Sequence, residues 1–266
     1  MSNNTFLFCA LLHEAKPFIS HYRLQKQQTH RAFTVYRKNT VTLTVTGMGK
    51  TAMAAGVAYT LASYPCQEPV LVNMGLAGHA EHPPGSVFAI HQITDPDTQA
   101  LFYPGRCRPA PCPSESLITH THAQTDYPDS GLVDMEGAGF YSVALRFTNV
   151  DLAQCLKVVS DNHAHPVDIE KLKSQPPLTL ALLPILERWL PELNRLRQTH
   201  DEPADFKTLT ERCHFSHSER ITLRQLLNRW QTLTEGEPLP SDVKQPNAPA
   251  ILQSLHQALD ALSIGL

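Results

Sequence analysis

Three acidic residues stand where strands and helices of the expected fold should meet. Asp161, with Ser160 before it, ends an apolar, β-branched run that is typical of a buried strand. Glu136 opens a segment with apolar residues at helical spacing, so we expect it in a first helical turn. Glu14 follows another short apolar run. Carboxylates give and take protons, and open α/β sheets bind ligands beyond the carboxyl ends of their strands, so Glu136 and Asp161 are both placed where a site would be. Glu14 stands at another strand end, where a solvated helix start is an equally good interpretation.

Each acid also has an ordinary explanation when it is considered alone. The helix dipole favours an acidic residue in a first turn, and aspartate after a strand often begins a tight turn. The pair of Glu136 and Asp161, rather than either member, therefore carries the functional hypothesis.

Glycines follow two of the expected strands. After the strand 40–46 come Gly47 and Gly49 and then an alanine-rich helix over 52–63, which together form a cradle for an anion or a backbone. The triphosphate-binding loop would require glycine where Thr44 stands, so we reject a nucleotide triphosphatase.

The run 70–78 repeats the pattern of an apolar strand followed by small residues. We expect a buried strand ending at Asn73, where Gly75 and Gly78 let the backbone approach a ligand closely, with Ala77 between them as a further candidate binding residue.

The order of segments predicts an αβ domain over 1–198 and a helical extension over 199–266. Thr- and Val-rich stretches at 31–37 and 40–46 indicate a hairpin, and 85–93 a further strand. Residues 95–134 are expected to be irregular, and 178–196 a helix interrupted by Pro184 and Pro191. The extension predicts two amphipathic helices, the first opened by a capping box of Ser216 and Glu219.

Composition narrows the class of protein. A formal charge of −3 argues against a nucleic-acid binder. Six cysteines without a disulfide pattern, no membrane-length apolar run and no basic leader favour a cytoplasmic protein that does not bind membranes. Fourteen histidines are many, but their spacing lacks the usual zinc signature, so we expect no metal and no cofactor.

Five segments, in this order, resemble the superfamily of purine nucleoside phosphorylases and methylthioadenosine/S-adenosylhomocysteine nucleosidases. They are Ala10–Ala15, Thr46–Lys50, Val72–Gly78, Val133–Ala138 and Val158–Asp161. The resemblance covers residues 5 to about 198. It implies a three-layer αβα sandwich around a mixed, partly barrel-like sheet, of the nucleoside phosphorylase type, with the C-terminal helical extension added to it.

The resemblance also implies a role for each acid in cleaving an N-glycosidic bond. Asp161, assisted by Ser160, would protonate the imidazole-ring nitrogen of a purine, and burial would keep this acid protonated. Glu136 would accept hydrogen bonds from the ribose hydroxyls while Met135 packs on the sugar. Glu14 would orient and deprotonate the attacking water.

Base recognition departs from the family pattern. The segment that usually brings a stacking aromatic ring has its nearest counterpart at 117–125, which offers His122 and Gln124 but no such ring. His163, just after the expected acid, is a further candidate contact to the base.

Two alternatives stay open beside hydrolysis. Phosphorylases of the superfamily place arginine before the glycine-rich strand end, where this chain has Val72 and Asn73, so water is favoured over phosphate. Arg37, Lys38 or Lys50 remain as candidates for a different phosphate site. The third reading is a nucleoside-binding or partner-binding protein without turnover. The resemblance further implies a homo-oligomer, a dimer or a hexamer.

Overall fold

The computed structural model describes residues 5–29, 32–105, 110–124, 127–166, 175–199, 203–234, 237–240, 243 and 247–263. The chain divides into two compact units, residues 1–197 and 198–266. The strands of the first unit are β1 (Thr5–Cys9), β2 (Gln25–Lys26), β3 (Thr34–Lys38), β4 (Val41–Val45), β5 (Val70–Gly78), β6 (Val87–Asp95), β7 (Ala100–Phe102), β8 (Ser114–Thr119), β9 (Leu132–Asp134) and β10 (Ala153–Asp161). The helices among its described residues are α1 (Leu12–His21), α2 (Lys50–Ser63), α3 (Gly137–Ala144), η1 (Leu178–Leu182) and α5 (Leu183–Thr199), the last of which ends two residues past the boundary.

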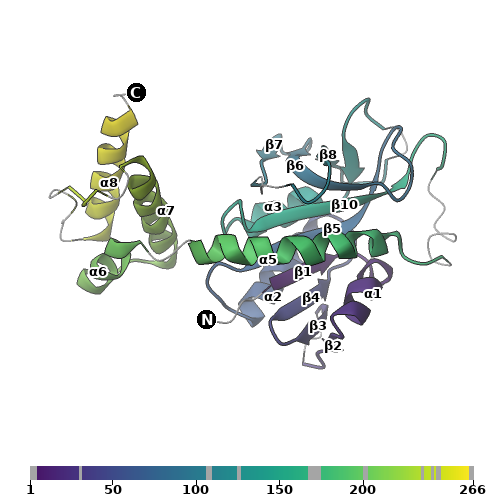
Figure 1. Ribbon diagram of the computed structural model, residues 1–266, viewed down its shortest axis with the longest axis horizontal. Coiled ribbons are helices and arrows are strands. Elements are labelled where there is room, and N and C mark those ends of the chain that lie inside the picture. The colour runs from purple at the N-terminus through teal and green to yellow at the C-terminus, as the bar shows by residue number, and fades with distance from the viewer. Residues whose placement is uncertain are drawn as a thin grey trace. The chain divides into compact units, whose positions relative to one another are not determined.

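One mixed sheet organises this unit. Strand β5 lies at its centre, parallel to β1 on one side and to β10 on the other. The order continues from β10 through β6, β8 and β9, and β9 pairs back onto β5, so five strands close into a barrel-like ring. On the other side β1, β4, β3 and β2 form an open edge (Figure 1). The expected mixed, partly barrel-like αβα sandwich is confirmed.

The two faces of the sheet bury separate sets of helices. Residues of α2 and α3 pack with Phe6 and Phe8 of β1, whereas residues of α1 and α5 pack with Leu7 and Cys9. Successive residues of a strand point to opposite faces, so this alternation along β1 forms the three layers. Buried, nearly continuous apolar strands are typical of such a sheet.

The hairpin at β3 and β4 is confirmed, but several sequence expectations were wrong, among them the three that follow. Residues 95–134 are not simply irregular, because they contain β7, β8 and β9, of which β7 and β9 have three residues each. Pro191 does not interrupt α5. Proline has no N–H to donate to the carbonyl of Glu187, but both residues lie on the exposed side of the helix, where water can hydrogen-bond to that carbonyl. Glu136 caps α3 rather than lying in its first turn.

In the described residues of the second unit lie α6 (Ala204–Arg212), α7 (His217–Leu233) and α8 (Ala248–Ser263), one helix more than the sequence predicted. Its core includes Phe206, Leu227, Trp230 and Leu255. The expected capping box is present: the backbone N–H of Glu219 donates to the Ser216 hydroxyl, and the Ser216 N–H donates to the Glu219 carboxylate.

Across the described residues of both units, no helix has the length and apolar character needed to cross a membrane.

Candidate active site

Glu14 is buried at the start of α1, directly after β1. Its Oε2 accepts the N–H of Leu11 at 2.9 Å, and its Oε1 accepts the N–H of Leu76 at 3.3 Å. Burial raises the pKa of Glu14, against the lowering effect of the Leu11 N–H and of the Lys157 ammonium. The carboxylate therefore faces the central strand β5 with its affinity for a proton increased, as suits a general base.

A buried ion pair lies beside Glu14. Nζ of Lys157 is 2.7 Å from Oδ2 of Asp134, and both side chains are almost completely buried. Asp134 also accepts hydrogen bonds from the Gly137 N–H and the Thr119 hydroxyl. Burial alone would lower the pKa of Lys157, but the nearby carboxylate of Asp134 outweighs this and the pKa is raised. Lys157 therefore remains a cation.

Gly75 of β5 marks where Glu14 and Lys157 converge. A Cβ atom placed on Gly75 would lie 3.5 Å from Oε1 of Glu14 and 3.6 Å from Nζ of Lys157. At this point β5 therefore has no side chain, and the carboxylate of Glu14 and the ammonium of Lys157 both lie beside its backbone. Sequence reasoning missed Lys157, because a lysine inside an apolar run carries no local sign of its buried partner.

Glu136 meets the N-terminus of α2. Its Oε1 accepts the N–H of Gly49 at 2.7 Å, and Gly49 has φ of +96°, a conformation that favours glycine. Burial first, and then the carboxylate of Asp134, raise the pKa of Glu136 to about 7, with Glu14 adding to the shift. The two glutamates therefore lie close enough to influence each other's charge.

The raised pKa of Glu136 predicts a stability that depends on pH. The folded state binds this proton more tightly than the unfolded chain, so the contribution is complete below the ordinary value of 4.5 and is lost as the pH rises to about 7. A shift of this size corresponds to about 3 kcal/mol. Between these pH values we expect the wild type to lose about 3 kcal/mol of unfolding free energy relative to Glu136→Gln, measured by urea unfolding. The exposed change Glu81→Gln is the control, and parallel wild-type and Glu136→Gln profiles would contradict the assignment.

Asp161 lies at the end of β10 and is 7% exposed. The Ser160 hydroxyl donates to its Oδ1, and the Tyr127 hydroxyl donates to its Oδ2. Across β10 and β5, Asp161 pairs with Gly78, three residues beyond Gly75. Three residues of strand span about 10 Å, so Asp161 is separated along β5 from the place where Glu14 and Lys157 meet.

Tyr127 is the second residue that sequence reasoning missed. It follows the segment 117–125 by only two residues, and its side chain is 8% exposed. The segment 117–125 has no aromatic ring, as the sequence indicated, but Tyr127 just beyond it brings one to Asp161. The sequence feature that could have identified it is a tyrosine just beyond that segment, but the residues around it have no periodic pattern.

The remaining predicted residues have varied positions. Asn73 is buried inside β5, where its amide faces the sulfur atoms of Met53 and Cys155. Ala77 belongs to the core on the α2 and α3 face, and Met135 is half-buried beside Glu136. His122 is exposed, and Gln124 donates to its carbonyl. His163 is exposed, with its ring edge-on to Tyr127 at 5.1 Å between centroids.

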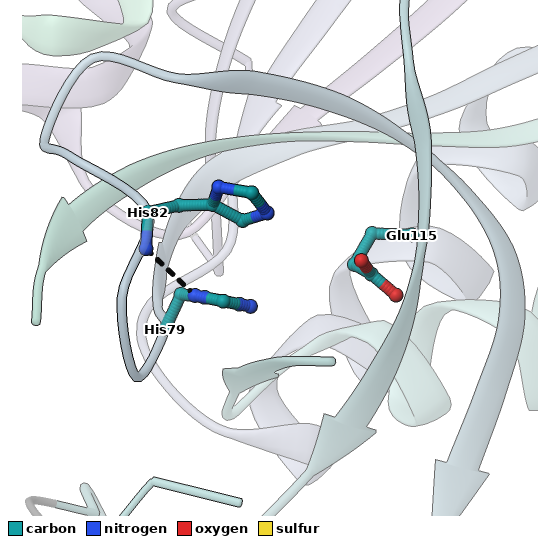
Figure 2. A group of neighbouring side chains, drawn as sticks. All are labelled: His79, His82 and Glu115. Atoms are coloured by element: carbon teal, nitrogen blue, oxygen red, sulfur yellow. Dashed lines mark hydrogen bonds between the residues drawn. The ribbon is translucent and has the colours of Figure 1, made fainter. Parts of the chain in front are cut away.

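His79, His82 and Glu115 form a further cluster near the end of β5, with ligand-type atoms within 4.8 Å of one another (Figure 2). Nδ1 of His79 accepts the N–H groups of Glu81 and His82 at 3.0 and 2.9 Å. In the neutral ring Nε2 therefore carries the proton, and a metal at Nε2 would have to displace it. The geometry favours a hydrogen-bonded turn over a metal site. The His79 N–H donates to the carbonyl of Asp161 at 3.1 Å, so this turn braces the end of β10.

Comparison with known proteins establishes the fold. No known family description and no curated protein matches the sequence. Solved structures do match. One is the 5′-methylthioadenosine nucleosidase of Arabidopsis thaliana, with 16% identity, a TM-score of 0.60 and coverage of 73% of this chain and 96% of that one. Futalosine hydrolase of Helicobacter pylori matches with 12% identity, a TM-score of 0.58 and coverage of 72% and 99%.

A third match is the 5′-methylthioadenosine/S-adenosylhomocysteine nucleosidase of Colwellia psychrerythraea, solved in complex with adenine. It shows 17% identity, a TM-score of 0.55 and coverage of 74% of this chain and 96% of that one. The expected likeness to these nucleosidases is confirmed for the fold.

Proposed function

We propose that the protein hydrolyses the N-glycosidic bond of a purine nucleoside of the methylthioadenosine or S-adenosylhomocysteine type. The observation that carries the proposal is the arrangement along β5. Glu14 and Lys157 meet at Gly75, Glu136 interacts with Glu14, and Asp161 lies about 10 Å further along at Gly78. Gly75 and Gly78 are an odd number of residues apart, and the register shift of β10 between Val159 and Asp161 is what would turn the acid to the same side. A sugar at the first position then has its attached base towards the second.

Each side chain then has one task. Asp161, with Ser160 beside it, gives a proton to the imidazole-ring nitrogen of the purine, so that the base leaves with the electron pair of the glycosidic bond. Glu136 accepts hydrogen bonds from the ribose hydroxyls. Glu14 takes a proton from water while the water oxygen bonds to the sugar carbon. The negative charge of the Glu14 carboxylate stabilises the oxocarbenium-like sugar. The raised pKa of Glu14 supports the role of base.

The positions of the cations support water over phosphate as the nucleophile. Lys50 is held by Asp95 and Asp97 at 2.7 and 2.6 Å, and the Arg37 guanidinium lies over the ring of Tyr64. The glycine cradle at the N-terminus of α2, a natural anion site, already binds the carboxylate of Glu136.

Lys157 is engaged as well. Its ammonium is paired with Asp134, so its charge is already balanced. A phosphate ion would need charge-assisted hydrogen bonds from cationic side chains. Lys50, Arg37 and Lys157 already interact with other side chains.

The decisive experiment follows free base after incubation with methylthioadenosine, S-adenosylhomocysteine, adenosine and inosine, each with and without phosphate. Release of base without phosphate supports hydrolysis. Release that requires phosphate would replace the proposal with phosphorolysis. No release from any of the four would overturn it in favour of a protein that binds nucleosides or partners without turnover. We also predict that the protein is a homo-oligomer. A measurement of its molecular mass in solution tests this prediction.

A further inference from the structure

The turn at 79–82, directly after β5, contains a buried histidine that the proposed reaction does not use. Nδ1 of His79 accepts the backbone N–H of Glu81 at 3.0 Å and that of His82 at 2.9 Å. A neutral imidazole has one such acceptor nitrogen, and the two N–H groups share its lone pair. The backbone of this turn therefore depends on the charge of His79.

The turn is tied to the end of β10. The His79 N–H donates to the carbonyl of Asp161 at 3.1 Å. The His163 N–H donates to the carbonyl of Ala80 at 3.3 Å. The buried amide of Asn162 donates to two further carbonyls of the turn, at 3.3 and 2.9 Å. Asp161 and the two residues after it are thus all bound to the turn.

A proton on Nδ1 of His79 would remove the acceptor on which the turn depends. Three N–H groups would then face one another without an acceptor, and a buried donor without a partner is costly. The turn would have to open to bring these groups to water, and its hydrogen bonds to the end of β10 would open with it.

The surroundings of His79 favour the neutral ring. Burial first, and then the ring of His82, whose centroid lies 4.1 Å from that of His79, lower the pKa of His79 from its usual 6.5 (Figure 2). The carboxylates of Glu115 on β8 and of Glu81 act in the opposite direction.

The titratable side chains at the end of β10 face other partners. The carboxylate of Asp161 accepts two hydroxyl groups. His165 faces the amide oxygen of Asn162, and the ring of His163 lies edge-on to another aromatic ring. The charge of His79 is therefore governed by its own turn and by β8.

On the premise of the proposed function, we propose that His79 is a positioning residue: its neutral ring holds the strand end that carries Asp161, and its protonation releases that end and slows turnover. Because the pKa of His79 is lowered, positioning is complete above pH 6.5 and is lost as the pH falls through that pKa. This loss is separate from the titration of the three acids.

Two variants of similar size and branching test the acceptor. His79→Asn puts a carbonyl oxygen, which does not titrate, close to the position of Nδ1, whereas His79→Leu accepts nothing. Above pH 6.5 we expect His79→Asn to keep kcat within about twofold of wild type. His79→Leu should lose about 10–100-fold in kcat, the cost of a misplaced catalytic group, with KM little changed.

The pH profile distinguishes positioning from a purely structural role. The ratio of kcat for His79→Asn to kcat for wild type should be near one above pH 6.5 and rise by about 10–100-fold as the pH falls. With Glu115→Gln in both proteins the rise should begin at lower pH, because Glu115 raises the pKa of His79. The control His256→Asn, at an exposed position of α8, should leave the profile unchanged.

A ratio that does not change with pH overturns the inference, as does wild-type turnover in His79→Leu. If His79→Leu does not fold, the ratio for His79→Asn decides alone. Nitrogen NMR of the histidine rings needs no turnover, and it should find the proton of neutral His79 on Nε2. A proton on Nδ1 at neutral pH would also overturn the inference. If the proton is on Nε2 but no nucleoside is cleaved, the proposed function fails while the dependence of the turn on His79 stands.

Discussion

Asp161→Asn should lower kcat for nucleoside cleavage by about 10²–10⁴-fold, the usual contribution of a positioned general acid. The amide has the shape of the carboxyl group but no proton of comparable acidity to give, so the purine would have to leave as an anion. Ser160 and Tyr127 can still bond to the side chain at this position. The loss should therefore appear in kcat rather than in the folded structure, as shown by turnover and urea unfolding measured on the same preparation.

The control for this variant is Asp129→Asn, the same chemical change at an exposed position outside any helix or strand. It should leave both turnover and unfolding unchanged. Turnover of Asp161→Asn within a few-fold of wild type would show that another group protonates the base, and Glu136 would then be the next candidate. If Asp161→Asn were unfolded, its loss of turnover would carry no information on the acid. The midpoint of urea unfolding therefore shows whether the variant is folded.

The sequence placed Asp161 at a strand end and Glu14 just after one because such placements depend on local patterns, whereas Glu136 is one position outside the helix expected for it. An apolar run that stops at a polar residue indicates a strand end. The closing of five strands into a ring does not follow from any local pattern. It depends on β9, three residues long, pairing back onto β5.

Partners that are distant in the sequence explain what was missed within the site. Lys157 appeared to be a stray charge in an apolar strand, because its partner Asp134 ends a different strand. Tyr127 lies in a segment whose apolar residues recur neither every two positions, as in a strand, nor every 3.6 positions, as in a helix. Asn73 showed the reverse error, since a polar residue in an apolar run suggested a strand end, whereas β5 continues to Gly78 and buries the amide.

The same pairing makes Lys157→Met the substitution with the largest expected effect on stability. Removing the ammonium leaves Asp134 buried with only neutral donors, the Gly137 N–H and the Thr119 hydroxyl. Breaking a buried pair from one side costs about 3–5 kcal/mol, because the remaining charge has no compensation. We expect that loss in urea unfolding at neutral pH. The matched control is Lys16→Met, which removes an exposed lysine of α1 and should change stability by no more than about 0.5 kcal/mol.

A double variant separates the lost charge from lost packing. In Lys157→Met/Asp134→Asn no carboxylate is left unpaired, so most of the unfolding free energy should return even though both ionic groups are gone. Activity should not return with it. Lys157 lowers the pKa of Glu14, and without the ammonium Glu14 holds its proton to higher pH, so less of the water-activating base is present near neutrality. A double variant that is stable but slow, with its rate rising as the pH is raised, would locate the function of the lysine in the charge of Glu14. A double variant as unstable as Lys157→Met would instead mean that the aliphatic chain and its packing, rather than the ion pair, hold this part of the sheet together.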